Sequence, residues 1–265
     1  MIESIQNKHI KWLLALQKNR KNRMKEKLFV VEGIKIIEEI PNDWEIVHVF
    51  VSNSFIKENA LFLNKIQINK NNIIEVSDKL FNTISDTVTP QGVLAVCKQK
   101  MFSLNDVLSI KEGFFIILEE IQDPGNLGTI IRTADAAGVD AIFITKGSVD
   151  LYNPKVIRST MGSIFHLPIF TDMDIDNLIE KLKDNNVSTL SAHLKANIYP
   201  YQYNFNKAIA LLIGNEAKGI KDSTSKKTDM LLKIPMQGKA ESLNAAVAAG
   251  ILMYEVVRQR ISKIN

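Results

Sequence analysis

The residues most suited to chemistry follow an apolar run at 114–118, in a segment with two glycines and an arginine. A strand, a glycine-bearing loop and a helix often form a phosphate site, but residues 125–128 match neither the dinucleotide nor the P-loop pattern. Arg132 is expected in the first turn of the helix, where a cation opposes the helix dipole. It either forms a surface salt bridge with Asp135 or aims, together with Asn126, at a phosphate or a developing oxyanion.

Two other apolar runs end in segments of the same kind. The run at 209–213 leads into Gly214 and Glu216, and a tight turn would account for the glycine but not for the glutamate. A third run, at 231–234, leads into a polar loop in which Ser242 can cap the last helix. Ligands of open α/β sheets bind beyond the carboxyl ends of the strands, so three such ends predict one convergent site.

Strand-like and helical patterns alternate through the second part of the chain, which predicts a parallel sheet covered by helices on both faces. We expect strands at 114–118, 141–144, 187–191, 209–213 and 231–234, and helices at 129–137, 154–163, 174–184 and 242–260. The last helix has one apolar face that is rich in small residues, which suits either core packing or a homodimer interface. This face comprises Leu243, Ala246, Val247, Gly250, Ile251 and Tyr254.

The first hundred residues form a separate pattern. Strands at 28–33, 46–51 and 92–96 alternate with helices at 34–40, 56–66 and 78–84, which predicts a small α/β unit. The sequence thus divides into a first domain at 1–100, a polar linker at 101–112 in which Ser103 can cap a helix, and a second domain at 113–265.

Composition and cysteine use narrow the class of protein. With 46% hydrophobic and 23% charged residues, the 265-residue chain has the composition of a soluble globular protein. It has neither an apolar run of the roughly 18 to 20 residues that a membrane span needs nor a signal-peptide core, so a cytoplasmic location is expected. Cys97 is the single cysteine, which excludes an intramolecular disulfide. The four histidines lack metal-ligand spacing, so no metal is expected.

Positive charge is concentrated at the start of the chain. Residues 1–35 contain nine Lys and Arg against three acidic residues, whereas the remainder contains 24 basic and 26 acidic residues. A basic segment of this kind is typical either of a contact with a nucleic-acid backbone or of a solvated helix. The candidate nucleic-acid contacts are Lys18, Arg20, Lys21, Arg23 and Lys25.

Taken in order, three motifs closely resemble those of the SpoU (TrmH-type) RNA ribose 2'-O-methyltransferases of the SPOUT superfamily. They are residues 123–134, residues 214–216, and residues 234–236 with 242–244, and the stretches 152–158 and 166–168 are also similar. Residues 1–100 more loosely resemble the family's L30e-like RNA-binding accessory domain. The resemblance implies a SPOUT α/β-knot fold with a deep C-terminal trefoil knot, S-adenosylmethionine bound in the knot, and a homodimer with the active site near the interface.

The resemblance also assigns residues to the site. On the catalytic side it places Asn126, Arg132, Glu216, Ser242 and Asn244, and against the cofactor it places Ala192, Ile213, Gly214, Ile234, Met236 and Leu243. Arg132 would activate the ribose hydroxyl. Because the pKa of an arginine exceeds about 12, we expect Arg132 to lower the pKa of the hydroxyl or to act through a substrate phosphate, and not to take the proton itself.

The expected function is S-adenosylmethionine-dependent methylation of a ribose 2'-hydroxyl in structured RNA. We favour 23S ribosomal RNA over tRNA, because a separate basic domain suits a large structured substrate. Two alternatives stay open: a tRNA ribose methyltransferase, and a knotted RNA-binding protein without activity. Loss of Arg132, Asn126 or Ser242 would favour the second alternative, and all three residues are present.

Overall fold

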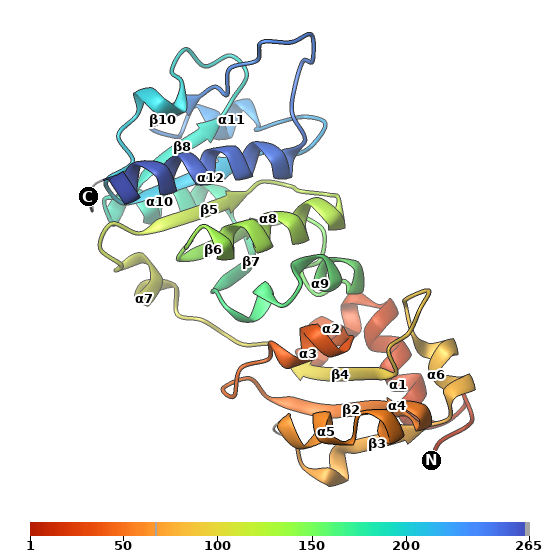
Figure 1. Ribbon diagram of the computed structural model, residues 1–265. Helices are drawn as coiled ribbons and strands as arrows, with labels where there is room; N and C mark the ends of the chain where they lie inside the picture. Colours follow the sequence, from red (N-terminus) through yellow and green to blue (C-terminus); the bar gives the residue numbers. More distant parts are fainter. Residues whose placement is uncertain (67, 263–265) are drawn as a thin grey trace. The chain divides into compact units, whose positions relative to one another are not determined.

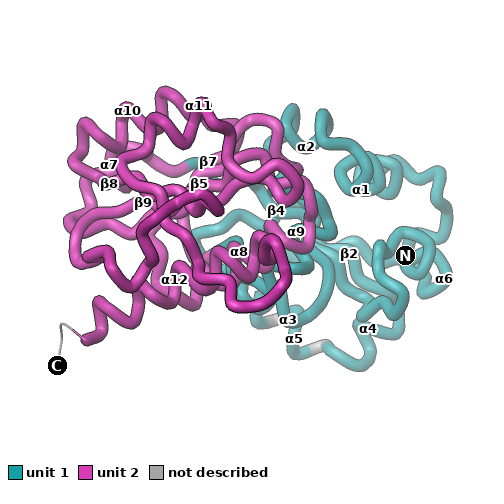
Figure 2. The backbone as a smooth tube through the Cα atoms, turned by 90° about the horizontal axis from the view of Figure 1, so that it is seen from above, with its two compact units in different colours: residues 1–101, 150–165 teal, residues 102–149, 166–265 magenta. Residues whose placement is uncertain are grey.

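The computed structural model describes residues 1–66 and 68–262, which divide into two compact units. The first unit combines Met1–Met101 with Asp150–Phe165, and the second combines Phe102–Val149 with the chain from His166 onward (Figure 2). The first unit therefore includes a short segment that interrupts the second in the sequence.

The second unit is built on a six-stranded sheet in which all neighbouring strands are parallel. The central strands β5 (Phe114–Leu118) and β9 (Ile209–Ile213) are apolar and buried along their whole length, as strands covered on both faces must be. The parallel sheet that the sequence predicts is confirmed. In sheet order, the strands are β10 (Met230–Leu232), β8 (Ser188–Ala192), β9, β5, β6 (Ala141–Thr145) and β7 (Ile169–Met173).

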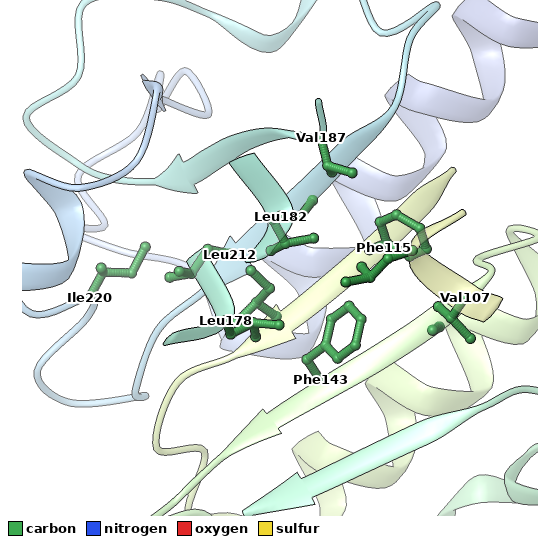
Figure 3. Close-up of a cluster of buried hydrophobic side chains, with 12 residues drawn as sticks. Val107, Phe115, Phe143, Leu178, Leu182, Val187, Leu212 and Ile220 are labelled. Atoms are coloured by element: carbon green, nitrogen blue, oxygen red, sulfur yellow. The ribbon is translucent and has the colours of Figure 1, made fainter. Parts of the chain in front are cut away.

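Helices cover both faces of this sheet. On one face, α8 (Pro124–Ala136) and α12 (Ala245–Ser262) lie side by side (Figure 1). On the other, α7 (Leu104–Leu108) and α10 (Ile175–Asp184) bury apolar side chains against Phe115 and its neighbours (Figure 3). The short helix α11 (Asp222–Ser225) follows β9. The sheet is thus the rigid layer from which the site is built.

The stretch expected to link the domains contains an ordered helix. Ser103 caps α7 by accepting a hydrogen bond from the Asp106 N–H, as its sequence position predicts. Val107 and Leu108 are buried in the core of the second unit, so residues 102–112 belong to that unit.

The first unit contains a four-stranded mixed sheet with helices around it. Its strand order is β1 (Leu28–Glu32), β4 (Val93–Lys98), β2 (Ile46–Ser52) and β3 (Ile73–Val76), with β4 antiparallel to both of its neighbours. The small α/β unit that the sequence predicts is present. The helices are α1 (Lys8–Lys18), α2 (Arg20–Glu26), α3 (Ile34–Glu38), α4 (Asn53–Glu58), α5 (Ala60–Lys65), α6 (Asp78–Ile84) and α9 (Pro154–Thr160).

Aromatic contacts attach the segment Asp150–Phe165 to the first unit. The rings of Phe29 and Tyr152 lie 4.8 Å apart, and those of Trp44 and Phe165 lie 4.9 Å apart. Stacked and edge-to-face pairs of this kind add to the apolar area that they bury. Helix α9, which the sequence places among the helices of the second part, therefore packs with the first unit.

Arg23 is buried, which corrects its assignment as an RNA contact. Its side chain is 4% exposed and donates to the Asp150 carboxylate, from Nε at 2.9 Å, and to the carbonyls of Leu16 and Gln17. A guanidinium that is enclosed and bonded in this way has no face left for a phosphate. The other four candidates, which are Lys18, Arg20, Lys21 and Lys25, are exposed.

Replacing Arg23 with alanine should lower the free energy of unfolding by about 3 kcal/mol, because it leaves the Asp150 carboxylate, which is only 13% exposed, without its partner. The matched variant Lys21→Ala, at an exposed position on the same helix, should change it by less than about 0.5 kcal/mol. Denaturant unfolding monitored by tryptophan fluorescence measures both values. Equal stability of the two variants would refute a structural role for Arg23.

Candidate functional site

Four neighbouring strands of the second unit end at the same edge of the sheet. The register pairs Leu118 of β5 with Ile213 of β9, and Leu232 of β10 with Ala192 of β8, while β8 also pairs with β9. The segments that follow these strands are the three motifs of the sequence and the residues after Ala192. The convergence that the sequence predicts is therefore observed.

Helix α8 begins five residues earlier than expected. Asp123 is its N-cap and accepts a hydrogen bond from the Asn126 N–H at 2.8 Å, and Pro124 occupies the first turn. Residues 125–128, predicted to be a loop, are thus helical. The Asp-Pro pair is a strong start signal for a helix, and it outweighs the two glycines that suggested a loop.

Three side chains, Asn126, Glu216 and Asn244, form a hydrogen-bonded group that we call the polar cluster. The Glu216 carboxylate accepts from the backbone N–H groups of Gln122 (3.1 Å) and Asp123 (3.0 Å) and from Nδ2 of Asn126 (3.1 Å). The Asn126 Oδ1 atom in turn accepts from Nδ2 of Asn244 at 2.8 Å. The polar cluster therefore joins the three motifs in one connected network.

Glu216 is ionised in this network. Partial burial raises the pKa of its carboxyl, but the hydrogen bonds from Asn126, Asp123 and Gln122 outweigh burial and leave the pKa below its ordinary value. An ionised carboxylate only accepts hydrogen bonds. Glu216 thus holds the start of α8 in place and is not a proton donor.

The turn that carries Glu216 is rigid because its neighbours are bonded on both sides. Asn215 donates from Nδ2 to the Glu120 carbonyl at 2.8 Å and accepts at Oδ1 from the N–H groups of Ala217 and Lys218. A Cβ on Gly214 would lie 2.3 Å from the backbone of Gly219, so only glycine fits there. Asn215 was not among the site residues expected from the sequence, although its side chain shapes the turn.

Asn244, and not Ser242, caps α12. The Asn244 Oδ1 atom accepts from the N–H groups of Ala246 (2.9 Å) and Val247 (3.3 Å), and the helix begins at Ala245. Both residue types are good caps, and the cap expected at Ser242 is wrong by two residues. Ser242 lies exposed in the loop before the helix and makes no hydrogen bond within the described part of the chain.

Arg132 is exposed on α8 and lies outside the polar cluster. It follows Asn126 by six residues, which is about 9 Å along the helix axis, so its expected place in the first turn is wrong. The proposed salt bridge with Asp135 is also absent, because Asp135 bonds Nδ1 of His166 at 2.8 Å. Among residues 1–66 and 68–262, Arg132 has no hydrogen bond or ion pair, so its guanidinium can meet a ligand.

The residues assigned to the cofactor lie at the ends of β8, β9 and β10. The His193 N–H donates to the Leu232 carbonyl at 2.9 Å and so holds the end of β8 against the end of β10. Met236 is partly buried. Leu243 belongs to the polar loop before α12, and 36% of its surface is accessible. Apolar groups beside strand ends suit the adenine ring and the methionine chain of S-adenosylmethionine. The whole set is Ala192, Ile213, Gly214, Ile234, Met236 and Leu243.

The apolar face expected on the last helix is divided between two sides. Ala246 is buried, and Gly250 packs toward Thr133 of α8, where an added Cβ would be 3.7 Å from its methyl group. Val247, Ile251 and Tyr254 instead form an exposed stripe, with 51%, 43% and 52% of their surfaces accessible. We call these three residues the α12 stripe. Ala246 and Gly250 therefore serve core packing, and the α12 stripe is available for an interface, so the face can serve both uses that the sequence left open.

No group of three or more His, Cys, Asp and Glu side chains in the described residues could hold a metal ion. Burial raises the pKa of the Cys97 thiol, so this residue is a packed apolar group and not a nucleophile. No helix in the described ranges has the length and apolar character that a membrane crossing needs.

Comparison with known proteins identifies the class. The model of the SpoU rRNA methylase family matches residues 113–254, and that of the MRM3-like substrate binding domain matches residues 7–95. The chain belongs to the SpoU rRNA methylase family. It is a methyltransferase that uses S-adenosylmethionine and acts on a ribose 2'-hydroxyl of RNA.

Individual relatives agree along the whole chain. The 23S rRNA (guanosine(2553)-2'-O)-methyltransferase RlmP of Bacillus subtilis is 35% identical over 96% of this chain and 98% of its own. The SpoU methyltransferase AviRb of Streptomyces viridochromogenes, solved with AdoMet, has a TM-score of 0.86 at 27% identity, covering 97% of this chain and all of its own. An AdoMet-bound rRNA methyltransferase of Sinorhizobium meliloti has a TM-score of 0.85 at 30% identity, covering 97% of both chains.

Proposed function

We propose that this enzyme methylates a ribose 2'-hydroxyl of 23S ribosomal RNA in the cytoplasm. The observation that carries the proposal is the similarity to the Bacillus subtilis 23S rRNA methyltransferase over nearly all of both chains, the first unit included. Because this similarity includes the first unit, which matches a substrate binding domain, it bears on the choice of RNA as well as on the chemistry.

Each part of the site has a role in this reaction. S-adenosylmethionine would supply the methyl group and leave as S-adenosylhomocysteine, while the proton of the attacking ribose hydroxyl would pass to solvent. Arg132 donates hydrogen bonds to the developing oxyanion or to a neighbouring phosphate. The polar cluster fixes the first turn of α8. Ser242 lies exposed in the loop just before Leu243 and Asn244, where its hydroxyl can contact the substrate ribose.

The first unit, built mainly from residues 1–101, is the RNA-binding accessory domain in this proposal, and the second unit is the catalytic domain with a trefoil knot. The exposed cations Lys18, Arg20, Lys21 and Lys25 would contact phosphates, which fits the excess of positive charge in this part of the chain. The match of residues 7–95 to a substrate binding domain supports this division.

We also propose that the enzyme acts as a homodimer through the α12 stripe. Three apolar side chains on an exposed helix face favour a partner, and α8, which carries Arg132, lies beside α12 on the same face of the sheet. Arg132 does not reach the polar cluster of its own chain. A second copy would supply the surface that completes the site around this residue.

Changing Ile251 to glutamate should convert the dimer into a monomer and reduce methyl transfer to the background rate, because a charge cannot be buried unpaired in an apolar interface. Light scattering after size-exclusion chromatography measures the mass. Met101→Glu, at another exposed apolar position, is the matched control and should remain dimeric. A wild-type protein that is monomeric at micromolar concentration would refute the dimer.

Labelled S-adenosylmethionine tests the function itself. The protein is incubated with 23S ribosomal RNA, 16S ribosomal RNA and tRNA, and modified nucleotides are mapped as 2'-O-methyl sites. Label in 23S RNA alone is expected. Label in tRNA alone would support the tRNA enzyme instead, and no transfer to any RNA by folded, cofactor-binding protein would support the inactive RNA-binding protein.

A further inference from the structure

The first unit contains a polar cavity of about 400 Å³ that has no role in the reaction described above. The rings of Phe55 and Phe81, both almost fully buried, provide its apolar lining. Glu58, Asn59 and Asn82 provide polar groups around it. Of the described residues that line the cavity, none is Lys or Arg.

The polar side chains of the cavity are available for a ligand. Within the described residues, Glu58, Asn59 and Asn82 form no hydrogen bond or ion pair through their side chains. Asp78, by contrast, is occupied, because it accepts from the N–H and the hydroxyl of Ser54 at 3.0 and 2.7 Å. No cation among the described residues lines the cavity, although Lys57 lies near enough to help lower the pKa of Asp78. The exposed amide of Asn82, the half-buried amide of Asn59 and the exposed Glu58 carboxylate suit an uncharged group that both donates and accepts hydrogen bonds.

One glycine shapes the cavity. Gly92, at its wall, has a φ of +84°, and a Cβ there would lie 2.7 Å from Oγ of Ser52 and 2.8 Å from Cβ of Phe55. Only glycine combines this backbone conformation with so close an approach. Gly92 therefore lets the wall of the cavity pack directly against Ser52 and Phe55.

The loop before Gly92 is held by a buried carboxylate. Glu32, which is 8% exposed, accepts hydrogen bonds from the hydroxyls of Ser85 and Thr87 and from the Asp86 N–H. Val88 follows directly and is fully exposed. A fixed loop that presents an apolar side chain to solvent is suited to contact a partner, and Pro90 and Gln91 continue this loop to the wall of the cavity.

We propose that this cavity binds one unstacked nucleobase of the RNA substrate, with an amino group of the base donating to Glu58. The inference rests on the proposed function, which makes RNA the partner of the first unit. Proteins that recognise RNA by sequence bind bases turned out of the stack, and read their edges with side-chain amides and carboxylates. The phosphate of the same nucleotide stays outside, because the Glu58 carboxylate, which is unpaired among the described residues, would repel it.

Variants of the full-length protein test the proposal. Asn82→Ala should raise the Kd for the RNA substrate about 5-fold and Glu58→Ala about 10-fold, as expected for a neutral and a charged hydrogen bond. The kcat at saturating RNA should stay at the wild-type value, because neither residue belongs to the reacting site. Asn71→Ala, at an exposed asparagine outside the cavity, is the matched control. Thermal melting verifies that every variant is folded.

A photocrosslink gives an independent measurement. RNA substituted with 6-thioguanosine should crosslink to the peptides that contain residues 55–59 or 78–82, and mass spectrometry identifies them. If wild type binds RNA but both cavity variants bind it as tightly as Asn71→Ala, the nucleobase site is refuted while the enzyme's function stands. If wild type binds no RNA of any class, both the site and the proposed substrate are refuted.

Discussion

Replacing Arg132 with alanine is expected to lower kcat by about 10²- to 10³-fold, the loss typical of removing a donor to developing charge. Affinity for S-adenosylmethionine and the Tm should remain at the wild-type values, because the exposed guanidinium bonds to no group in the described structure. Single-turnover methylation, calorimetric titration of the cofactor and thermal melting measure the three quantities.

Two further variants show what the loss at Arg132 means. Arg132→Lys keeps the charge but lacks the planar fork of donors, so it should recover only part of kcat. Lys181→Ala, at an exposed cation on α10, should leave kcat unchanged. If cofactor affinity or Tm falls together with kcat in Arg132→Ala, the residue supports the structure and not the reaction.

Glu216→Gln is expected to lower kcat/KM by about 10²-fold. The carboxylate accepts from three N–H donors, and an amide would turn one of its own donors toward them. The first turn of α8 would then lose its attachment, which hydrogen exchange of residues 122–128 detects as faster exchange. Glu180→Gln, at an exposed glutamate on α10, should alter neither measurement. Unchanged exchange with reduced kcat/KM would mean that Glu216 contacts the substrate directly.

The pH dependence of this attachment follows from the lowered pKa of Glu216. A carboxyl whose pKa is lower in the folded than in the unfolded state stabilises the fold above the unfolded value of about 4.3. That stabilisation is lost as the pH falls through the lower, folded pKa. At neutral and mildly acidic pH the Glu216 carboxylate therefore stays ionised and the polar cluster stays intact. In this pH range we expect the protection of the backbone amides at residues 122–128 of the wild type from hydrogen exchange to stay constant.

The central strands were predictable because each is apolar along its whole length. All five residues of β5 and all five of β9 are buried, and both strands lie at their expected positions. Strands β7 and β3 were missed. Both lie at a sheet edge, where one side of the strand meets solvent, so each has only a short apolar signal: β7 begins with Ile169 but contains exposed polar residues.

The polar cluster was predictable in its members but not in its bonds. Strand ends converge in any parallel sheet, which brings Asn126 and Glu216 together, and the family motifs supply Asn244. The position of Arg132 relative to these residues was predicted wrongly, because it depends on where α8 begins. Gly125 and Gly128 suggested a loop, but they lie within the helix. Arg23 was misassigned for a different reason: nothing in a local run of cations reveals that Asp150, 127 residues later, is its partner.

The bonds of the polar cluster determine when the active site can exist during synthesis. Glu216 bonds Asn126 across 90 positions of the sequence, and Asn244 bonds Asn126 across 118. Contacts between residues so far apart form slowly, because a long loop must close first. A ribosome therefore has to release Asn244 before the first turn of α8 is fully anchored, and nascent chains that stop before this residue should contain a largely complete sheet without methyl-transfer activity.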